Sequence, residues 1–284
     1  MYATTWDGLL KSSDGGLQWK MVNAIHASGL WARSAQEVYA SDKQLHRSSD
    51  GGRTWRAIPL PVGADIANLW GTGVAEVYAI GSLGSSESRP FILHSNDAGN
   101  SFVELRVDAK LGFLKSIGGT AHEVVVGGTV NPPHSAGLLF RSVDQGSHWQ
   151  NVPLPPNEEE GGPSVNGICF TRSGKMLVAT SYSVFATSDD GSHWTALYRG
   201  ENHELLALGC LGNEVFVGGR GLFLHSLDEG ATWYDEELDP LYTSEMVGMY
   251  QTIGFGSKGE VYVGGEGGYN PANVGSLFRR AAAQ

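Results

Sequence analysis

Six aspartates recur along the chain in the same local pattern and are the first candidates for chemistry. Each has a Ser or Thr two residues before it, a Gly two residues after it and a Trp or Phe five residues after it; they are Asp14, Asp50, Asp97, Asp144, Asp189 and Asp228. Repeated carboxylates of this kind could act as metal ligands or catalytic acids. Each stands alone in its segment, however, whereas Ca²⁺ needs several oxygen ligands in one loop. We therefore interpret the six aspartates as structural turn residues that accept backbone N–H bonds, with the glycine at positive φ.

Histidines offer a second route to metal or acid–base chemistry, and the chain has nine. They form neither an HExxH motif nor a close His/Cys cluster, the arrangements typical of zinc sites. His148 and His193 directly precede the tryptophan of their aspartate segments, so we expect both at the surface. A three-residue site built from His26, His134 and His203 is the alternative. We predict no metal and no cofactor.

Two cysteines, Cys169 and Cys210, lie in apolar runs. Two cysteines do not make a disulfide framework. We expect buried, inert thiols, with a mutual disulfide or a reactive thiol as the alternatives.

A second repeated sequence motif lies between the aspartate segments and predicts the strands that position them. It is a short apolar strand that begins with Glu-Val at residues 37, 76, 123, 214 and 260, with Lys175 in the glutamate's place in one copy and a further copy at residues 1–4. The run before this motif predicts another strand, over residues 24–31, 66–70, 113–117, 165–170, 205–208 and 247–253. A third strand leads into each aspartate turn, and a fourth begins at its aromatic residue. All are too short and too rich in β-branched residues for helices.

The aspartate pattern resembles the Asp-box (BNR) repeat of sialidases, sortilin-type ectodomains and a photosystem assembly factor, which are β-propellers. The mean spacing of about 43 residues fits a four-stranded propeller blade. The resemblance implies an all-β fold, a seven-bladed β-propeller of four-stranded antiparallel blades, with residues 1–284 as one domain. In this interpretation the first blade lacks its innermost strand and the last blade its outermost. A six-bladed ring is the alternative.

Asp-box repeats also invite a test for sialidase chemistry. The nearest match to the sialidase FRIP-type motif is Arg56-Ala57-Ile58-Pro59, which lacks the Phe and falls on a predicted outer strand. No nucleophile elbow or phosphate-binding loop occurs. We therefore expect a non-catalytic binding or scaffold module, and the alternative is a glycoside hydrolase or lyase with carboxylates near the axis.

Unequal loop lengths predict where such a module binds. The longest links fall on the side of the predicted blades opposite the aspartate turns, and variable loops on a rigid frame commonly carry function. The predicted binding residues lie at the ends of inner strands and in these links: His26, Asp42, Asp65, Lys115, Asn131, Asn166, Tyr182, His203, Arg220, Glu245, Glu266 and Tyr269.

Charge limits the partners. Nineteen Lys and Arg against thirty Asp and Glu give a net charge of −11, which disfavours nucleic acid and anionic membranes. No stretch is long and apolar enough to predict membrane insertion. We expect a monomer with a protein or glycan partner. The sequence as given opens without a signal peptide and predicts a cytoplasmic protein, or an exported one if a further segment precedes it.

Overall fold

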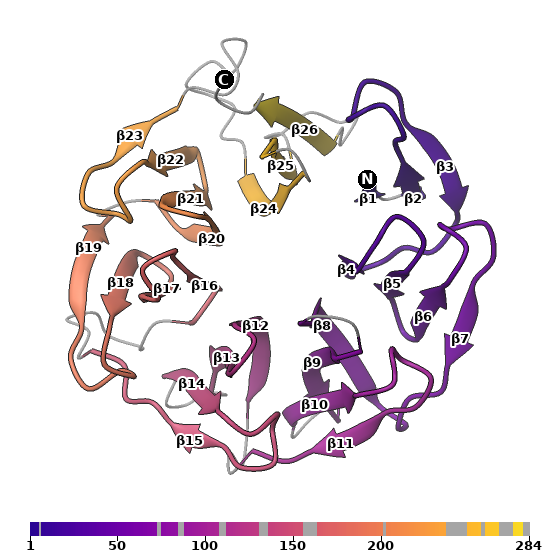
Figure 1. Ribbon diagram of the computed structural model, residues 1–284, viewed down its shortest axis with the longest axis horizontal. Helices are drawn as coiled ribbons and strands as arrows, with labels where there is room; N and C mark the ends of the chain where they lie inside the picture. Colours follow the sequence, from indigo (N-terminus) through magenta and orange to yellow (C-terminus); the bar gives the residue numbers. More distant parts are fainter. Residues whose placement is uncertain are drawn as a thin grey trace. The chain divides into compact units, whose positions relative to one another are not determined.

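The computed structural model describes residues 1–5, 7–72, 75–84, 88–107, 112–130, 136–155, 164–200, 203–236, 249–256, 259–266 and 275–280, with the backbone alone for residues 266 and 275–280. This part of the chain holds 26 strands and no helix. The strands form seven antiparallel sheets, each in chain order (Figure 1). The sheets belong to two compact units, Met1–Asn151 and Val152–Gln284.

The first unit contains four sheets. They are β1 (Tyr2–Thr5), β2 (Gly8–Lys11) and β3 (Lys20–Asn23); β4 (Gly29–Ala32), β5 (Val38–Ser41), β6 (Leu45–Ser48) and β7 (Arg56–Ile58); β8 (Ala64–Trp70), β9 (Val77–Leu83), β10 (Arg89–Ser95) and β11 (Val103–Leu105); and β12 (Phe113–Gly119), β13 (Val124–Thr129), β14 (Gly137–Ser142) and β15 (Gln150–Asn151).

The second unit contains three sheets. They are β16 (Gly167–Phe170), β17 (Met176–Ala179), β18 (Ser183–Thr187) and β19 (Thr195–Arg199); β20 (Leu205–Leu211), β21 (Glu214–Gly219), β22 (Leu222–Ser226) and β23 (Tyr234–Asp235); and β24 (Met249–Phe255), β25 (Val261–Glu266) and β26 (Gly275–Arg280). Within the described residues, the first and last sheets have three strands each, as predicted: the first has no innermost strand and the last no outermost strand.

Of the inner strands, β4 differs most from its predicted start. The sequence predicts a strand from residue 24, but β4 begins at Gly29, which pairs with Ser41 at the end of β5. Because β5 has only four residues, the chain before Ser28 has no strand to pair with in this sheet. The length of the partner strand decides where the inner strand begins.

The core of each unit lies between consecutive sheets. The middle strands are buried on both faces, as β5 and β17 show along their whole lengths. In the first unit, Tyr39 and Leu45 pack against Ile66 and Phe91 of the next sheet. Burial on both faces explains why these strands are apolar runs instead of alternating patterns.

The Asp-box segments form the turns between the third and fourth strands. In each turn the Ser or Thr hydroxyl donates to the Asp Oδ1 at 2.8–2.9 Å and accepts the N–H of the box glycine at 2.7–3.0 Å. The same Oδ1 accepts the N–H of the residue four positions later at 2.8–2.9 Å. The hydroxyl and the carboxylate together satisfy the backbone of the turn.

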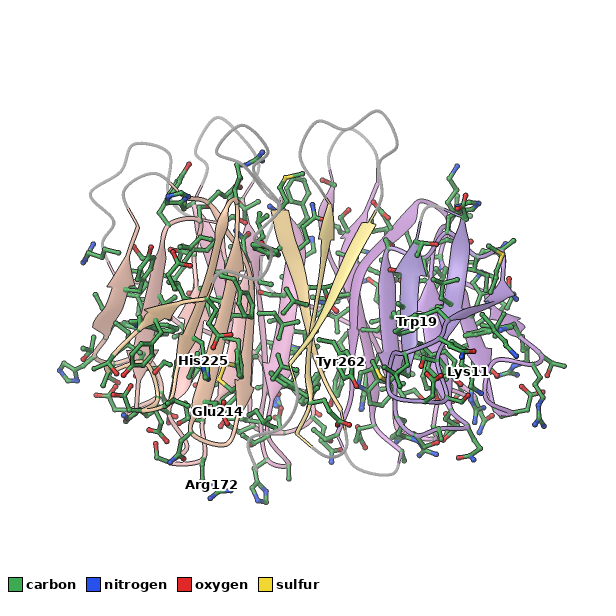
Figure 2. The ribbon with its side chains drawn as sticks, turned by 90° about the horizontal axis from the view of Figure 1, so that it is seen from above. Lys11, Trp19, Arg172, Glu214, His225 and Tyr262 are labelled. Carbon is green, nitrogen blue, oxygen red and sulfur yellow. A yellow bond between two sulfur atoms is a disulfide. The ribbon has the colours of Figure 1, made fainter. Side chains whose placement is uncertain are left out.

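The repeated glutamate at the start of the second strand also has a structural partner. It pairs with an Arg or His side chain on the third strand of the same sheet: Glu37 with Arg47, Glu76 with His94, Glu123 with Arg141 and Glu214 with His225. Figure 2 shows Glu214 beside His225, whose other ring nitrogen lies 2.9 Å from Glu236. These pairs account for a repeated residue that the strand pattern alone does not need.

The prediction of free cysteine thiols was wrong. Cys169 in β16 and Cys210 in β20 form a disulfide, with their Cα atoms 5.6 Å apart. The alternative of a mutual disulfide is the arrangement in the structure, because β16 and β20 are neighbouring inner strands of consecutive sheets.

Candidate functional site

The box aspartates are held in states that do not suit acid catalysis. A backbone N–H bond from His148 holds the pKa of Asp144 at about 2, and the His193 imidazole is the main cause of a pKa of about 2 at Asp189. Hydroxyl donors such as Thr54 lower the pKa of their own box aspartates further. Carboxylates with such low pKa values stay ionised near neutral pH and cannot donate a proton.

Four predicted binding residues of the second unit come together at the ends of its sheets away from the aspartate turns. Asn166 donates its side-chain amide to the Leu205 carbonyl at 2.8 Å, and the Leu205 N–H bonds to Ser181, next to Tyr182, at 2.7 Å. His203 and Arg220 are joined by a bond of 2.8 Å from the ring to the backbone carbonyl. We call this surface the second-unit rim and define it as Asn166, Tyr182, His203, Glu204 and Arg220.

The rim presents its polar groups on a fixed backbone. A carbonyl oxygen can only accept, so the bond to Arg220 places the proton on Nδ1 of His203 and leaves Nε2 as an acceptor in the neutral ring. Glu204 and Arg220 form an ion pair at 3.6 Å, and their side chains are 40% and 53% exposed. An exposed ion pair at this distance is weak, so Glu204 and Arg220 can each leave the pair and bind a group of a partner instead.

The described rim lacks an activated nucleophile. His203 bonds to a backbone carbonyl and not to a Ser, a Cys or a carboxylate. Across the described residues, no group of three His, Cys, Asp or Glu side chains could hold a metal ion. The described groups of the rim can therefore bind a partner through hydrogen bonds and charge.

The predicted residues of the first unit are not assembled in the same way. Asp42 caps the turn after β5, where its Oδ1 accepts the Gln44 N–H at 2.6 Å and lies 3.2 Å from His46 Nε2. His26, Asp65 and Lys115 are exposed. Among the described residues, no hydrogen bond joins these four to one another. Asp42 therefore has a local structural role.

The side chains of four predicted binding residues are outside the described part of the structure. Asn131, Glu245 and Tyr269 lie outside the described residues, and Glu266 is described only as the last backbone position of β25. They remain predictions.

Sequence reasoning missed one structural feature of the inner strands. The four longest of them are bulged after the same position, so that Ala67, Lys115, Leu206 and Gln251 each have no residue opposite them in the register. Of these four residues, only Lys115 was predicted. A β-bulge re-aims a side chain and often lies beside a functional site. No residue type marks the position, so only a register could reveal it.

The sialidase-like segment has a structural role. Arg56 lies in β7, the outermost strand of its sheet, and donates to the Gly99 carbonyl of the next box turn at 3.2 Å. An arginine bound there does not contribute to a substrate site near the inner strands.

Comparisons with known proteins point to the fold. No protein-family model matches the chain, and no curated protein matches it in sequence. The solved structure of YCF48 bound to a D1 peptide is 17% identical, with a TM-score of 0.71, and the match covers 100% of this chain and 88% of that one. The chain has the fold of a seven-bladed β-propeller.

Two further propellers match smaller parts of larger proteins. The extracellular domain of BT4673 from B. thetaiotaomicron is 11% identical with a TM-score of 0.71, covering 100% of this chain and 38% of that one. A GH74 xyloglucanase from Xanthomonas campestris is 15% identical with a TM-score of 0.61, covering 92% and 47%. Propellers of this shape thus include an enzyme and a peptide-bound protein. The described residues contain no helix long and apolar enough to cross a membrane.

Proposed function

We propose that this propeller is a non-catalytic binding module that holds a protein partner at the second-unit rim. The observation that supports the proposal is that the backbone segments beside Asn166, Tyr182, His203 and Arg220 are joined to one another by hydrogen bonds. Asn166 bonds to Leu205, Leu205 to Ser181 and His203 to Arg220, so these segments are fixed before any partner arrives. A preorganised surface loses less conformational entropy on binding. The peptide bound by YCF48 supports a protein partner over other classes.

Charge supports a proposal for the chemistry of the partner. The second unit has 17 Asp and Glu against 7 Lys and Arg, whereas the first unit has 13 against 12. The excess negative charge of the chain therefore belongs to the unit that carries the rim. Complementary charge speeds encounter, so we infer that the partner presents an extended segment with Lys or Arg residues.

Selection from a displayed library of random peptides tests this proposal. Peptides enriched on the wild-type protein should contain Lys or Arg, and Glu204→Gln should weaken the best of them about two- to fivefold, the range of an exposed charge pair. Asp7→Asn, which removes an exposed carboxylate of the first unit, is the matched control and should leave the affinity unchanged. Salt should slow association by screening over roughly 10 Å at 0.1 M.

Three results would count against the proposal. Enrichment of peptides without cations would contradict the inferred chemistry. Equal losses from Glu204→Gln and Asp7→Asn would remove the rim from the interaction. Release of reducing sugars from xyloglucan by the purified protein would favour the glycoside hydrolase alternative.

A further inference from the structure

Inner strands of neighbouring sheets meet through one large and one small residue. In the first unit, the Trp31 side chain of β4 packs on Gly71, where an added Cβ would lie 2.7 Å from Trp31 Cη2. Trp70 packs in the same way on Gly119, again with 2.7 Å between the added Cβ and Cη2. Each junction therefore takes one indole and one position without a side chain.

The strand registers show that the disulfide occupies this same junction. Trp31, Trp70 and Cys169 pair with Tyr39, Tyr78 and Leu177, each the second residue of its sheet's second strand. Gly71 directly follows Trp70. Cys210 directly follows Gly209, which pairs with Phe216 as Trp70 pairs with Tyr78. Cys169 thus stands at the tryptophan position and Cys210 at the glycine position.

A third version of the junction reverses the sizes. Gly209 stands at the tryptophan position and Phe255 at the glycine position of the next sheet, and a Cβ at Gly209 would lie 2.8 Å from the Phe255 ring. The aromatic residue can therefore lie on either of the two strands, provided that a glycine faces it on the other strand. The cysteine pair contains no large side chain, so at this position the covalent bond takes the place of the aromatic packing.

Reduction of the disulfide would weaken the contact between β16 and β20 at the cysteines and at the residues beside them. Two thiols must separate to van der Waals distance, and together they are smaller than an indole. Beside them, Gly167 approaches so closely that an added Cβ would lie 2.5 Å from Leu208 Cβ. Farther along, Asn166 donates to the Leu205 carbonyl at 2.8 Å, at the second-unit rim. Strands that separate at the cysteines would weaken both contacts.

We propose that Cys169–Cys210 is a redox-dependent clamp that closes the junction between β16 and β20 in an oxidising compartment and opens it under reduction. A dithiol reductant breaks the S–S bond by transferring two electrons and two protons. Both cysteines become thiols, and the reductant is oxidised to its own disulfide. Disulfides persist in exported proteins and are rare in the reducing cytosol, so the clamp assigns the working protein to an oxidising compartment.

Hydrogen exchange of the purified protein tests the clamp without any partner. Dithiothreitol should speed exchange of the Leu205 amide, which bonds to Ser181, by up to roughly a thousandfold, because closing a 41-residue loop restricts the unfolded chain by about that factor. The Ser28 amide of the first unit, which bonds to Ser41, is the internal control and should not respond. Alkylation should find both thiols only after reduction.

A matched variant separates the covalent bond from the packing. Cys169→Trp with Cys210→Gly rebuilds the packing of the first-unit junction without a closed loop. Its Leu205 amide should therefore exchange more slowly than in the reduced wild type, at a rate that dithiothreitol does not change. Cys169→Ala with Cys210→Ala should exchange as fast as the reduced wild type. Two free thiols in the never-reduced protein, or full reduction without faster exchange at Leu205, would overturn the inference.

Discussion

Two glycines of the second unit separate backbone strain from crowding in the Asp-box turn. Gly230 in the last box has φ +87° and Gly174 in the turn between β16 and β17 has φ +86°. Alanine at either position places an L side chain in the left-handed region, which costs about 1–2 kcal/mol. Because the two φ values match, this contribution should be the same in both variants.

The surroundings of the two glycines differ. An added Cβ at Gly230 would lie 2.6 Å from Leu197 Cδ1 of the preceding sheet and 3.2 Å from Trp233 Cζ2, whereas nothing lies within 4 Å of one at Gly174. Overpacking of this kind typically costs a further 1–3 kcal/mol. We therefore expect Gly174→Ala to lower the free energy of unfolding by about 1–2 kcal/mol, the strain alone. Gly230→Ala should lower it by roughly 2–5 kcal/mol, the sum of strain and overpacking.

Urea unfolding followed by tryptophan fluorescence measures both variants. Adding Leu197→Ala to Gly230→Ala makes room for the new methyl group, so the double variant should lose less stability than the sum of the two single variants. Adding Leu197→Ala to Gly174→Ala should be additive. Equal losses from the two glycine variants, or additivity at Gly230, would show that the neighbouring side chain gives way and that close approach is not what requires glycine there.

Three further predictions concern the turns. Ser226→Ala should destabilise the protein by about 1–3 kcal/mol by leaving the buried Gly230 amide without its acceptor, whereas Ser226→Thr should be neutral in thermal unfolding because a threonine does the same work in the preceding box. Trp233→Phe should cost about 0.5–1.5 kcal/mol more than Trp149→Phe, because the Trp233 indole donates to a carbonyl at 3.0 Å and the described surroundings of the Trp149 indole offer no acceptor. The pKa values of Asp189 and Asp228 are about 2, below their ordinary range, so their stabilising effect is complete above about pH 4 and lost as pH falls toward 2; a urea midpoint that stays constant over this range would contradict it.

Features set by neighbouring residues were predictable from the sequence. The Asp-box turn and the Glu-Val strand are each encoded by a short run of consecutive residues. These runs located all seven sheets, including the three-stranded first and last ones. The start of β4 was not predictable in this way, because it depends on the length of β5. The disulfide depends on the relative register of two sheets and joins cysteines 41 residues apart, which no local run of residues encodes.

The predicted binding residues also differ in how far the sequence pattern determines their role. Asn166, Tyr182, His203 and Arg220 each lie close to the end of a strand, which their position in the repeat predicts; their role in binding stays a prediction. Asp42 occupies an end of the same kind, yet its carboxylate is used within its own turn. An acidic residue two positions before a turn amide can accept a hydrogen bond from that amide. Residue type and position in the repeat do not distinguish this local role from a role in binding.

The uneven charge of the two units is not a by-product of the turns. The first unit contains four of the six box aspartates, yet its acidic and basic residues nearly balance, whereas the second unit contains two and has an excess of ten negative charges. Turn chemistry would place the larger negative charge in the first unit. Self-repulsion of such an excess opposes compaction, so the fold alone does not account for it. The cationic partner proposed above would account for it, because complementary charge would attract such a segment to the unit that carries the rim.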